Sequence, residues 1–221
     1  MCFTDGERWI ERREDAGQRH SALIMAMVQS TLDEARCVSS DLDEIAFGAG
    51  PGSFTGLRIA CGIAQGIGYG SRIPVRAVSS LLAVAQASRG DTVIAAIDAR
   101  MNEVYWAVYR RGTQDARSPQ WHEVVAPTAS PADAVALPHD TSLEATAWCA
   151  AGNAFARFAP LIAMLPPSTR IEASIEVTAR AIAELALTGH GRLDDAEHAT
   201  PVYIRDKVAM TSAERLALRR S

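Results

Sequence analysis

Gly48 to Gly70 reads GAGPGSFTGLRIACGIAQGIGYG, and the rest of the chain is organised around this stretch. The apolar run just before it, residues 45–47, predicts a strand. The Gly50-Pro51-Gly52 triplet then predicts a turn, because glycine tolerates positive φ and proline fixes φ near one value. Ser53 or Thr55 is expected to cap the helix that follows, because a side-chain oxygen can accept a free N–H of the first turn.

A strand, a glycine turn and a capped helix together present backbone N–H groups to an anion. The turn lacks the Lys-Ser/Thr pair of a Walker loop, so its spacing alone is no signature of nucleotide binding. Two alternatives therefore stay open, a phosphate-binding loop and a tight strand-to-helix connection. The residues that would form the loop are Gly50, Gly52, Ser53, Thr55 and Arg58.

The predicted helix over residues 54–70 carries an unusual number of small residues. They recur every four positions, in one ridge of Gly56, Ala60, Ala64 and Gly68 and a second ridge of Gly62, Gly66 and Gly70. Each glycine costs about 1 kcal/mol of helix stability relative to alanine, so the pattern indicates a compensating close contact. Packing against the chain's own sheet accounts for one ridge. We expect the second ridge to contact another protein chain.

The composition is that of a soluble globular protein. Among 221 residues, 48% are hydrophobic and 22% charged, enough for one large domain or two small lobes. The formal net charge of −4 argues against a surface that binds RNA strongly by itself. The four cysteines form no CxxC pair, which favours free thiols in a reducing compartment. No signal peptide or membrane-spanning run is recognised, so we expect a cytoplasmic protein without membrane contact.

Two elements are predicted before the glycine stretch. Residues 1–12 predict a β-hairpin, because an Asp-Gly pair is a strong two-residue turn signal. Residues 18–37 predict a helix with an apolar stripe at helical spacing, and its first half is apolar nearly all round. Partner contact and plain core packing are both open for this helix. The side chains assigned to a partner surface here are Leu23, Met27 and Thr31.

The second half of the chain predicts further strands and helices. Strands are expected at 92–97, 103–109, 121–125 and 145–150, a turn at 98–102, and helices at 130–137 and 174–188. Residues 160–171 are typical of a linker. The mildly basic tail, residues 205–221, is expected to be a solvated end.

Three segments together resemble one protein family. Residues 47–70, 95–106 and 201–208 are similar, in this order, to segments of the bacterial tRNA threonylcarbamoyladenosine biosynthesis protein TsaB (YeaZ) family. The resemblance thus runs over most of the chain. It implies an α/β fold of the actin-like ATPase superfamily, with two actin-like, ribonuclease H-like lobes at residues 1–89 and 90–204.

The same family begins one strand earlier, with an Asp-Thr pair on the central strand of its first sheet. The first lobe is therefore expected to lack that strand here, and truncation of the sequence is favoured over evolved loss. A sheet without its middle strand would leave unpaired N–H and C=O groups on both neighbours.

The predicted turn at 98–102 opens the second lobe, where actin-like folds bind phosphate. By resemblance Asp98 and Arg100 occupy that place. The alternative is that Asp98 caps the turn and Arg100 pairs with Glu103 on the surface. The alternative is the favoured interpretation.

Catalysis is not predicted. Relatives in the superfamily that perform chemistry carry an HxxxH metal pair, and the five histidines here, His20, His122, His139, His190 and His198, have no such spacing. A catalytic metal needs about three protein ligands. We therefore expect no metal site and a non-catalytic subunit. The alternative is an active glycoprotease-like metallopeptidase or an ATP-binding ATPase of the same superfamily.

The resemblance also implies partners. The chain would support the catalytic subunit TsaD in N6-threonylcarbamoyladenosine (t6A) modification of adenosine 37 of tRNAs reading codons that start with A. Helices 18–37 and 54–70 would form the contact, and the same surface would allow a homodimer when the chain is alone. The ATPase subunit TsaE joins the complex, tRNA is contacted only indirectly, and ATP or ADP is expected only at the complex interface.

Overall fold

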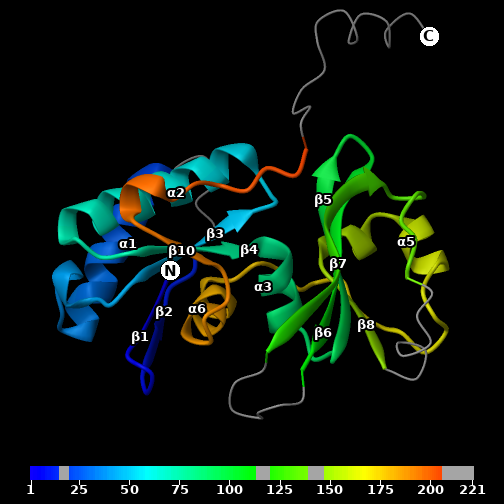
Figure 1. The fold of residues 1–221 in the computed structure, drawn as a ribbon, viewed down its shortest axis with the longest axis horizontal. Helices are drawn as coiled ribbons and strands as arrows, with labels where there is room; N and C mark the ends of the chain where they lie inside the picture. Colours follow the sequence, from blue (N-terminus) through cyan, green and yellow to red (C-terminus); the bar gives the residue numbers. More distant parts are fainter. Residues whose placement is uncertain (15–19, 113–119, 139–146, 206–221) are drawn as a thin grey trace, which may run out of the picture.

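The computed structural model describes residues 1–14, 20–112, 120–138 and 147–205, and within these ranges the fold is mixed α/β, as the sequence predicts (Figure 1). In chain order, with η for 3-10 helices, the elements are β1 (Cys2–Thr4), β2 (Trp9–Glu11), α1 (His20–Ala35), η1 (Ser39–Asp41), β3 (Ile45–Gly50), α2 (Phe54–Ser71), β4 (Val75–Ser79), α3 (Ser80–Ala87), β5 (Thr92–Arg100), β6 (Glu103–Arg111), β7 (Trp121–Pro131), β8 (Trp148–Ala151), η2 (Asn153–Ala156), α5 (Ala159–Ala163), β9 (Arg170–Glu172), α6 (Ala179–Leu187), β10 (Arg192–Asp194) and η3 (Ala196–His198).

The described strands form three sheets. β1 and β2 pair as the predicted antiparallel hairpin, separate from the other strands. The first larger sheet has the order β10-β4-β3, with β3 and β4 parallel and β10 antiparallel to β4. The second larger sheet has the order β7-β6-β5-β8-β9. Its β5–β6 pair is the antiparallel hairpin expected from the sequence.

Helix α3 lies between the two larger sheets, with α6 beside it against the first sheet, and both helices belong to one core shared with both sheets (Figure 1). The α3 side chains from Leu81 to Ala85 are all buried, because a helix that is apolar all round needs neighbours on every side. Val78 on β4 and Val93 on β5 belong to the same cluster. A single apolar core therefore joins the two sheets.

Helix starts follow the local sequence signals. The Ser53 hydroxyl accepts the N–H of Gly56 at the start of α2, as predicted. The Ser79 hydroxyl accepts the N–H of Leu82 in the same way at α3. Capping works from sequence alone because donor and acceptor lie within four residues of each other.

One predicted helix, residues 130–137, is wrong. The chain remains in β7 through Pro131, and a turn follows. Proline is tolerated here because β7 is an edge strand, with no neighbour on its outer side that needs the missing N–H. The Ser130 hydroxyl also accepts a hydrogen bond from Trp106 Nε1 at 3.0 Å, which fixes the strand's end on β6.

The predicted linker at 160–171 is more ordered than expected, because it holds most of α5 and the start of β9. The helix predicted at 174–188 is shorter than expected. Thr178 is the N-cap of α6, and its hydroxyl accepts the N–H of Ala181, so the helix begins only at Ala179. Strand β10 was not predicted. It returns the chain to the first sheet, although its residues were assigned to the second lobe. The division at residue 89 itself stays a prediction, and residues 206–221 of the tail lie outside the described residues.

Among the described residues, no helix combines the length and apolar character that crossing a bilayer requires.

Candidate functional site

The inner face of α2 packs against the first sheet and η3. Its buried residues are Leu57, Cys61, Ala64 and Gly68. A Cβ added at Gly68 would lie 2.6 Å from Val75 Cγ2 and 3.0 Å from the Ala196 Cβ. Real Cβ atoms essentially never lie as close as 2.6 Å to another heavy atom, so any larger residue here would have to displace Val75. Packing against Val75 and Ala196 therefore accounts for Gly68, the last small residue of the first ridge.

The outer face of α2 is different. Gly62, Gly66 and Gly70 are exposed, and a Cβ built on any of them would meet no atom within 4 Å. No contact among the described residues therefore calls for glycine at these three positions, which still lower helix propensity. The sequence predicts that this second ridge contacts another protein chain. The exposure of its glycines agrees with that prediction, which stays a prediction.

Tyr69 is a surface residue that the sequence analysis missed. It lies on α2 between Gly66 and Gly70, and 73% of its surface is exposed. Aromatic residues are enriched in protein interfaces, where they supply large contact area at low entropic cost. The available signal was the position of an aromatic residue beside two glycines of the same ridge.

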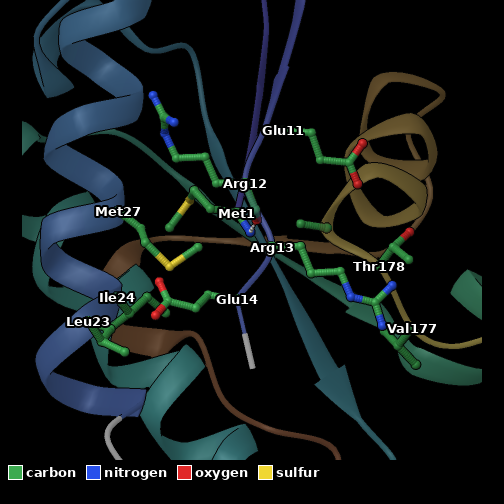
Figure 2. Close-up of a pocket in the computed structure, with 11 residues that line it drawn as sticks. Met1, Glu11, Arg12, Arg13, Glu14, Leu23, Ile24, Met27, Val177 and Thr178 are labelled. Atoms are coloured by element: carbon green, nitrogen blue, oxygen red, sulfur yellow. Dashed lines mark hydrogen bonds between the residues drawn. The ribbon is translucent and has the colours of Figure 1, made fainter. Parts of the chain in front are cut away.

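Helix α1 presents its predicted interface residues to the protein's own hairpin. Figure 2 shows Leu23 and Met27 pointing from α1 toward Met1 and Glu14. Thr31 is only 3% exposed, and its hydroxyl accepts a hydrogen bond from Arg12 Nε at 3.1 Å. Thr31 is therefore removed from the candidate partner surface, because its side chain is already used inside the chain.

Leu23 and Met27 of α1 line one wall of a groove of about 250 Å³, with Val177 and Thr178 on the opposite wall (Figure 2). Two ion pairs hold its rim, Arg12 with Glu34 at 2.6 Å and Arg13 with Glu176. The amino group of Met1 donates to the Arg12 carbonyl, and burial lowers its pKa. The exposed side of α1 instead carries Met25, which is 50% exposed.

The glycine turn is covered by a later part of the chain. The Val202 N–H donates to the Ala49 carbonyl at 2.7 Å. Gly50 has φ +120, and a Cβ there would lie 2.6 Å from the Val202 carbonyl oxygen. Gly50 is thus required by its conformation and by the close approach of Val202. These contacts favour the tight structural connection over the phosphate loop, for which binding stays untested.

The other turn residues also have partners within the chain or are exposed. Ser53 caps α2, and Thr55 and Gly52 lie at the surface edge of the turn. The Arg58 Nε donates to the Tyr203 hydroxyl at 3.2 Å, and its guanidinium stacks 3.9 Å from the centre of the Phe54 ring. Arg58 is therefore engaged by aromatic groups of its own chain.

At the β5–β6 turn, Asp98 acts as the favoured alternative predicts. One carboxylate oxygen accepts the Arg100 N–H at 2.9 Å, and the other pairs with Arg157 at 2.7 Å. The expected Arg100–Glu103 pair is not what the structure shows, because Glu103 is ion-paired with Arg205. The polar groups of this turn are thus used for its own geometry and for ion pairs with Arg157 and Arg205.

The described residues contain no group of three or more His, Cys, Asp or Glu side chains arranged to hold a metal ion. His20 and His139 have side chains outside the described part of the chain. Burial raises the pKa of the Cys61 thiol, which donates to the Ala199 carbonyl at 3.4 Å. A protonated, hydrogen-bonded thiol is a poor nucleophile.

Comparison with known proteins identifies the family. The family model described as TsaD, tRNA N6-adenosine threonylcarbamoyltransferase, matches residues 13–213. The chain is 34% identical over 211 residues to the tRNA threonylcarbamoyladenosine biosynthesis protein TsaB of Escherichia coli (strain K12), which covers 87% of this chain and 83% of that protein. It is 39% identical over 149 residues to the protein of the same name from Haemophilus influenzae, covering 62% of each.

A solved structure agrees with these relatives. YeaZ from Pseudomonas aeruginosa has a TM-score of 0.79 and 35% sequence identity to this chain, over 91% of this chain and 92% of that one. The sequence identity and the structural similarity both extend over nearly the whole length, so they support the same family assignment. The chain belongs to the TsaB (YeaZ) family, within the wider family that the TsaD model describes.

Proposed function

We propose that this chain acts in tRNA threonylcarbamoyladenosine biosynthesis as a non-catalytic subunit that binds and supports TsaD. Family membership supports the pathway, since the relatives from E. coli and H. influenzae are named for it. The observation that carries the subunit role is the outer face of α2, where a Cβ added at any of three exposed glycines would meet no described atom within 4 Å and Tyr69 is 73% exposed.

The proposed partner surface is built for a second helix. Glycines at Gly62, Gly66 and Gly70 let a partner backbone approach closely, and the Tyr69 ring supplies an anchor beside them. A second copy of the chain can use the same face, so homodimer formation and TsaD binding exclude each other. TsaE joins through the resulting complex, and tRNA is contacted through the partners.

The non-catalytic role is supported by how the candidate reactive groups are used. Ser53 caps a helix, Arg58 stacks on Phe54, and Asp98 closes its own turn. Each is held by the chain rather than presented to a substrate. ATP or ADP would accordingly bind only at the interface of the complex.

The two larger sheets correspond, in this proposal, to two actin-like lobes, residues 1–89 and 90–204, except that β10 returns from the second range to the first sheet. The parallel β3–β4 pair followed by α3 and the β5–β6 hairpin at the start of the second sheet support this division. The shared core around α3 is the junction between the lobes.

Reconstitution tests the proposal. Tyr69→Ala should weaken pull-down of TsaD and reduce t6A formation on unmodified tRNA with TsaD and TsaE, while the melting temperature stays close to that of the wild type. Leu187→Ala is the matched control, because Leu187 is 59% exposed but lies on α6. Wild-type chain that neither binds TsaD nor raises t6A formation would overturn the proposed function. Unchanged binding by Tyr69→Ala would overturn the α2 surface alone.

A further inference from the structure

The two larger sheets are connected at two separate places. At one, α3 and α6 share an apolar core with both sheets. At the other, residues 199–205, here called the strap, leave η3 and run along α2 toward the tip of the β5–β6 hairpin (Figure 1). The core contact is broad and apolar, whereas the strap is a single extended segment.

The strap is firmly attached to the first sheet side. The Ala199 carbonyl is fully buried and accepts hydrogen bonds from Gln65 Nε2 at 2.9 Å and from the Cys61 thiol. Further along, the Val202 N–H donates to the Ala49 carbonyl at 2.7 Å, directly beside the glycine turn. Backbone atoms provide several of these contacts, so they do not depend on one side chain.

Aromatic contacts extend this attachment. The Tyr203 ring lies 5.7 Å from the Phe54 ring, and its hydroxyl accepts from Arg58 Nε. Both aromatic rings nevertheless remain partly exposed. The strap thus covers the start of α2 while its Val202 and Tyr203 side chains stay exposed.

The attachment to the second sheet rests on Arg205. Its side chain is 14% exposed and forms an ion pair with Glu103, the first residue of β6. The guanidinium also lies 5.7 Å from the centre of the Tyr105 ring. Arg205 Nε is buried and has no hydrogen-bond partner among the described residues. A guanidinium with an unpaired buried N–H gains less from the contact than a fully satisfied one.

We propose that the strap is a clasp that holds the β5–β6 tip against the first sheet, with the Arg205–Glu103 pair as its releasable end. The core around α3 acts as the hinge when the pair separates. Release frees the end of the strap at Arg205 and lets the β5–β6 tip move away from the first sheet, while Ala199 and Val202 stay attached beside the glycine turn. This role requires only the chain itself and does not depend on the proposed partner.

Hydrogen–deuterium exchange on the full chain tests the clasp. Glu103→Gln should accelerate amide exchange of peptides covering 97–103 by roughly tenfold, because a hydrogen-bonded charge pair closes this contact. Peptides from α3 should exchange at the wild-type rate, and the radius of gyration from small-angle scattering should rise. Arg205→Lys, which keeps the charge but loses the planar fork, should show the same pattern more weakly.

Asp194→Asn is the matched control. It removes the Arg192–Asp194 pair, which lies within β10 and crosses between no two sheets, and it should leave exchange at 97–103 unchanged. Wild-type exchange rates in both Glu103→Gln and Arg205→Lys would overturn the proposal. Acceleration that includes α3 to the same extent would also overturn it, because the pair would then stabilise the whole fold rather than a local clasp.

Discussion

Glycine occurs on both faces of α2, but its surroundings differ between the two faces. On the inner face, Gly68 leaves no room for a Cβ because Val75 and Ala196 lie against it. On the outer face, Gly66 has nothing within 4 Å of the same position. Both glycines lower the helix propensity by about 1 kcal/mol relative to alanine. In the part of the chain that the structure describes, only the inner glycine has a close contact that offsets this loss.

The difference separates folding from association on one helix. Substitutions on the inner face should change the free energy of unfolding, because they disturb the core under α2. Substitutions on the outer face should leave the fold intact and change binding, provided that a partner helix lies there. The following variants test this separation.

Leu57→Ala should have the largest effect. Leu57 is buried on the inner face, and truncating a buried leucine lowers the free energy of unfolding by roughly 2–5 kcal/mol. Urea denaturation of the monomer measures the change. A loss well under 1 kcal/mol would show that the inner face is loosely packed and would remove the basis of the comparison.

Gly68→Ala should lower the free energy of unfolding by roughly 1–3 kcal/mol, because the new methyl group overpacks a filled site. The added Cβ would lie 2.6 Å from Val75 Cγ2 and 3.1 Å from the Ile73 carbonyl oxygen. Thermal and urea unfolding measure the effect. A more stable Gly68→Ala protein would mean that the sheet yields and that glycine is not required at this site.

Gly62→Leu should weaken association without unfolding the chain. The side chain would hold a partner helix away, at a cost of roughly 1–3 kcal/mol, which weakens binding about tenfold to a hundredfold. Analytical ultracentrifugation of the isolated chain and pull-down with TsaD measure it. Should association stay the same while the chain unfolds, the second ridge packs internally and the partner surface must be abandoned.

Gly66→Ala should have the smallest effect and the opposite sign from Gly68→Ala. Because its Cβ meets no atom within 4 Å, alanine should raise the stability of the monomer by roughly 0.5–1 kcal/mol through helix propensity alone. Circular dichroism melting compares the two variants directly. Destabilisation by Gly66→Ala would reveal a contact on the outer face that the described residues do not show.

The local parts of the fold were predictable from the sequence. The hairpin at the start, the strand before the glycine turn and the Ser53 cap of α2 all depend on residues a few positions apart. Periodicity and turn chemistry carry that information, because the hydrogen-bond partners are close along the chain. The family and its α/β class followed from the same local segments.

What the tertiary structure alone decided depends on residues far apart in the sequence. Thr31 is not part of the candidate partner surface, because its hydroxyl accepts a hydrogen bond from Arg12. Glu103 pairs with Arg205 rather than with Arg100. The predicted helix at 130–137 yielded to β7, because pairing with β6 outweighed its local pattern. Helical spacing identified two ridges on α2, but it could not say which ridge the chain covers. The position of the first sheet decides which ridge is buried, because burial depends on the packing partners of a helix rather than on its propensity.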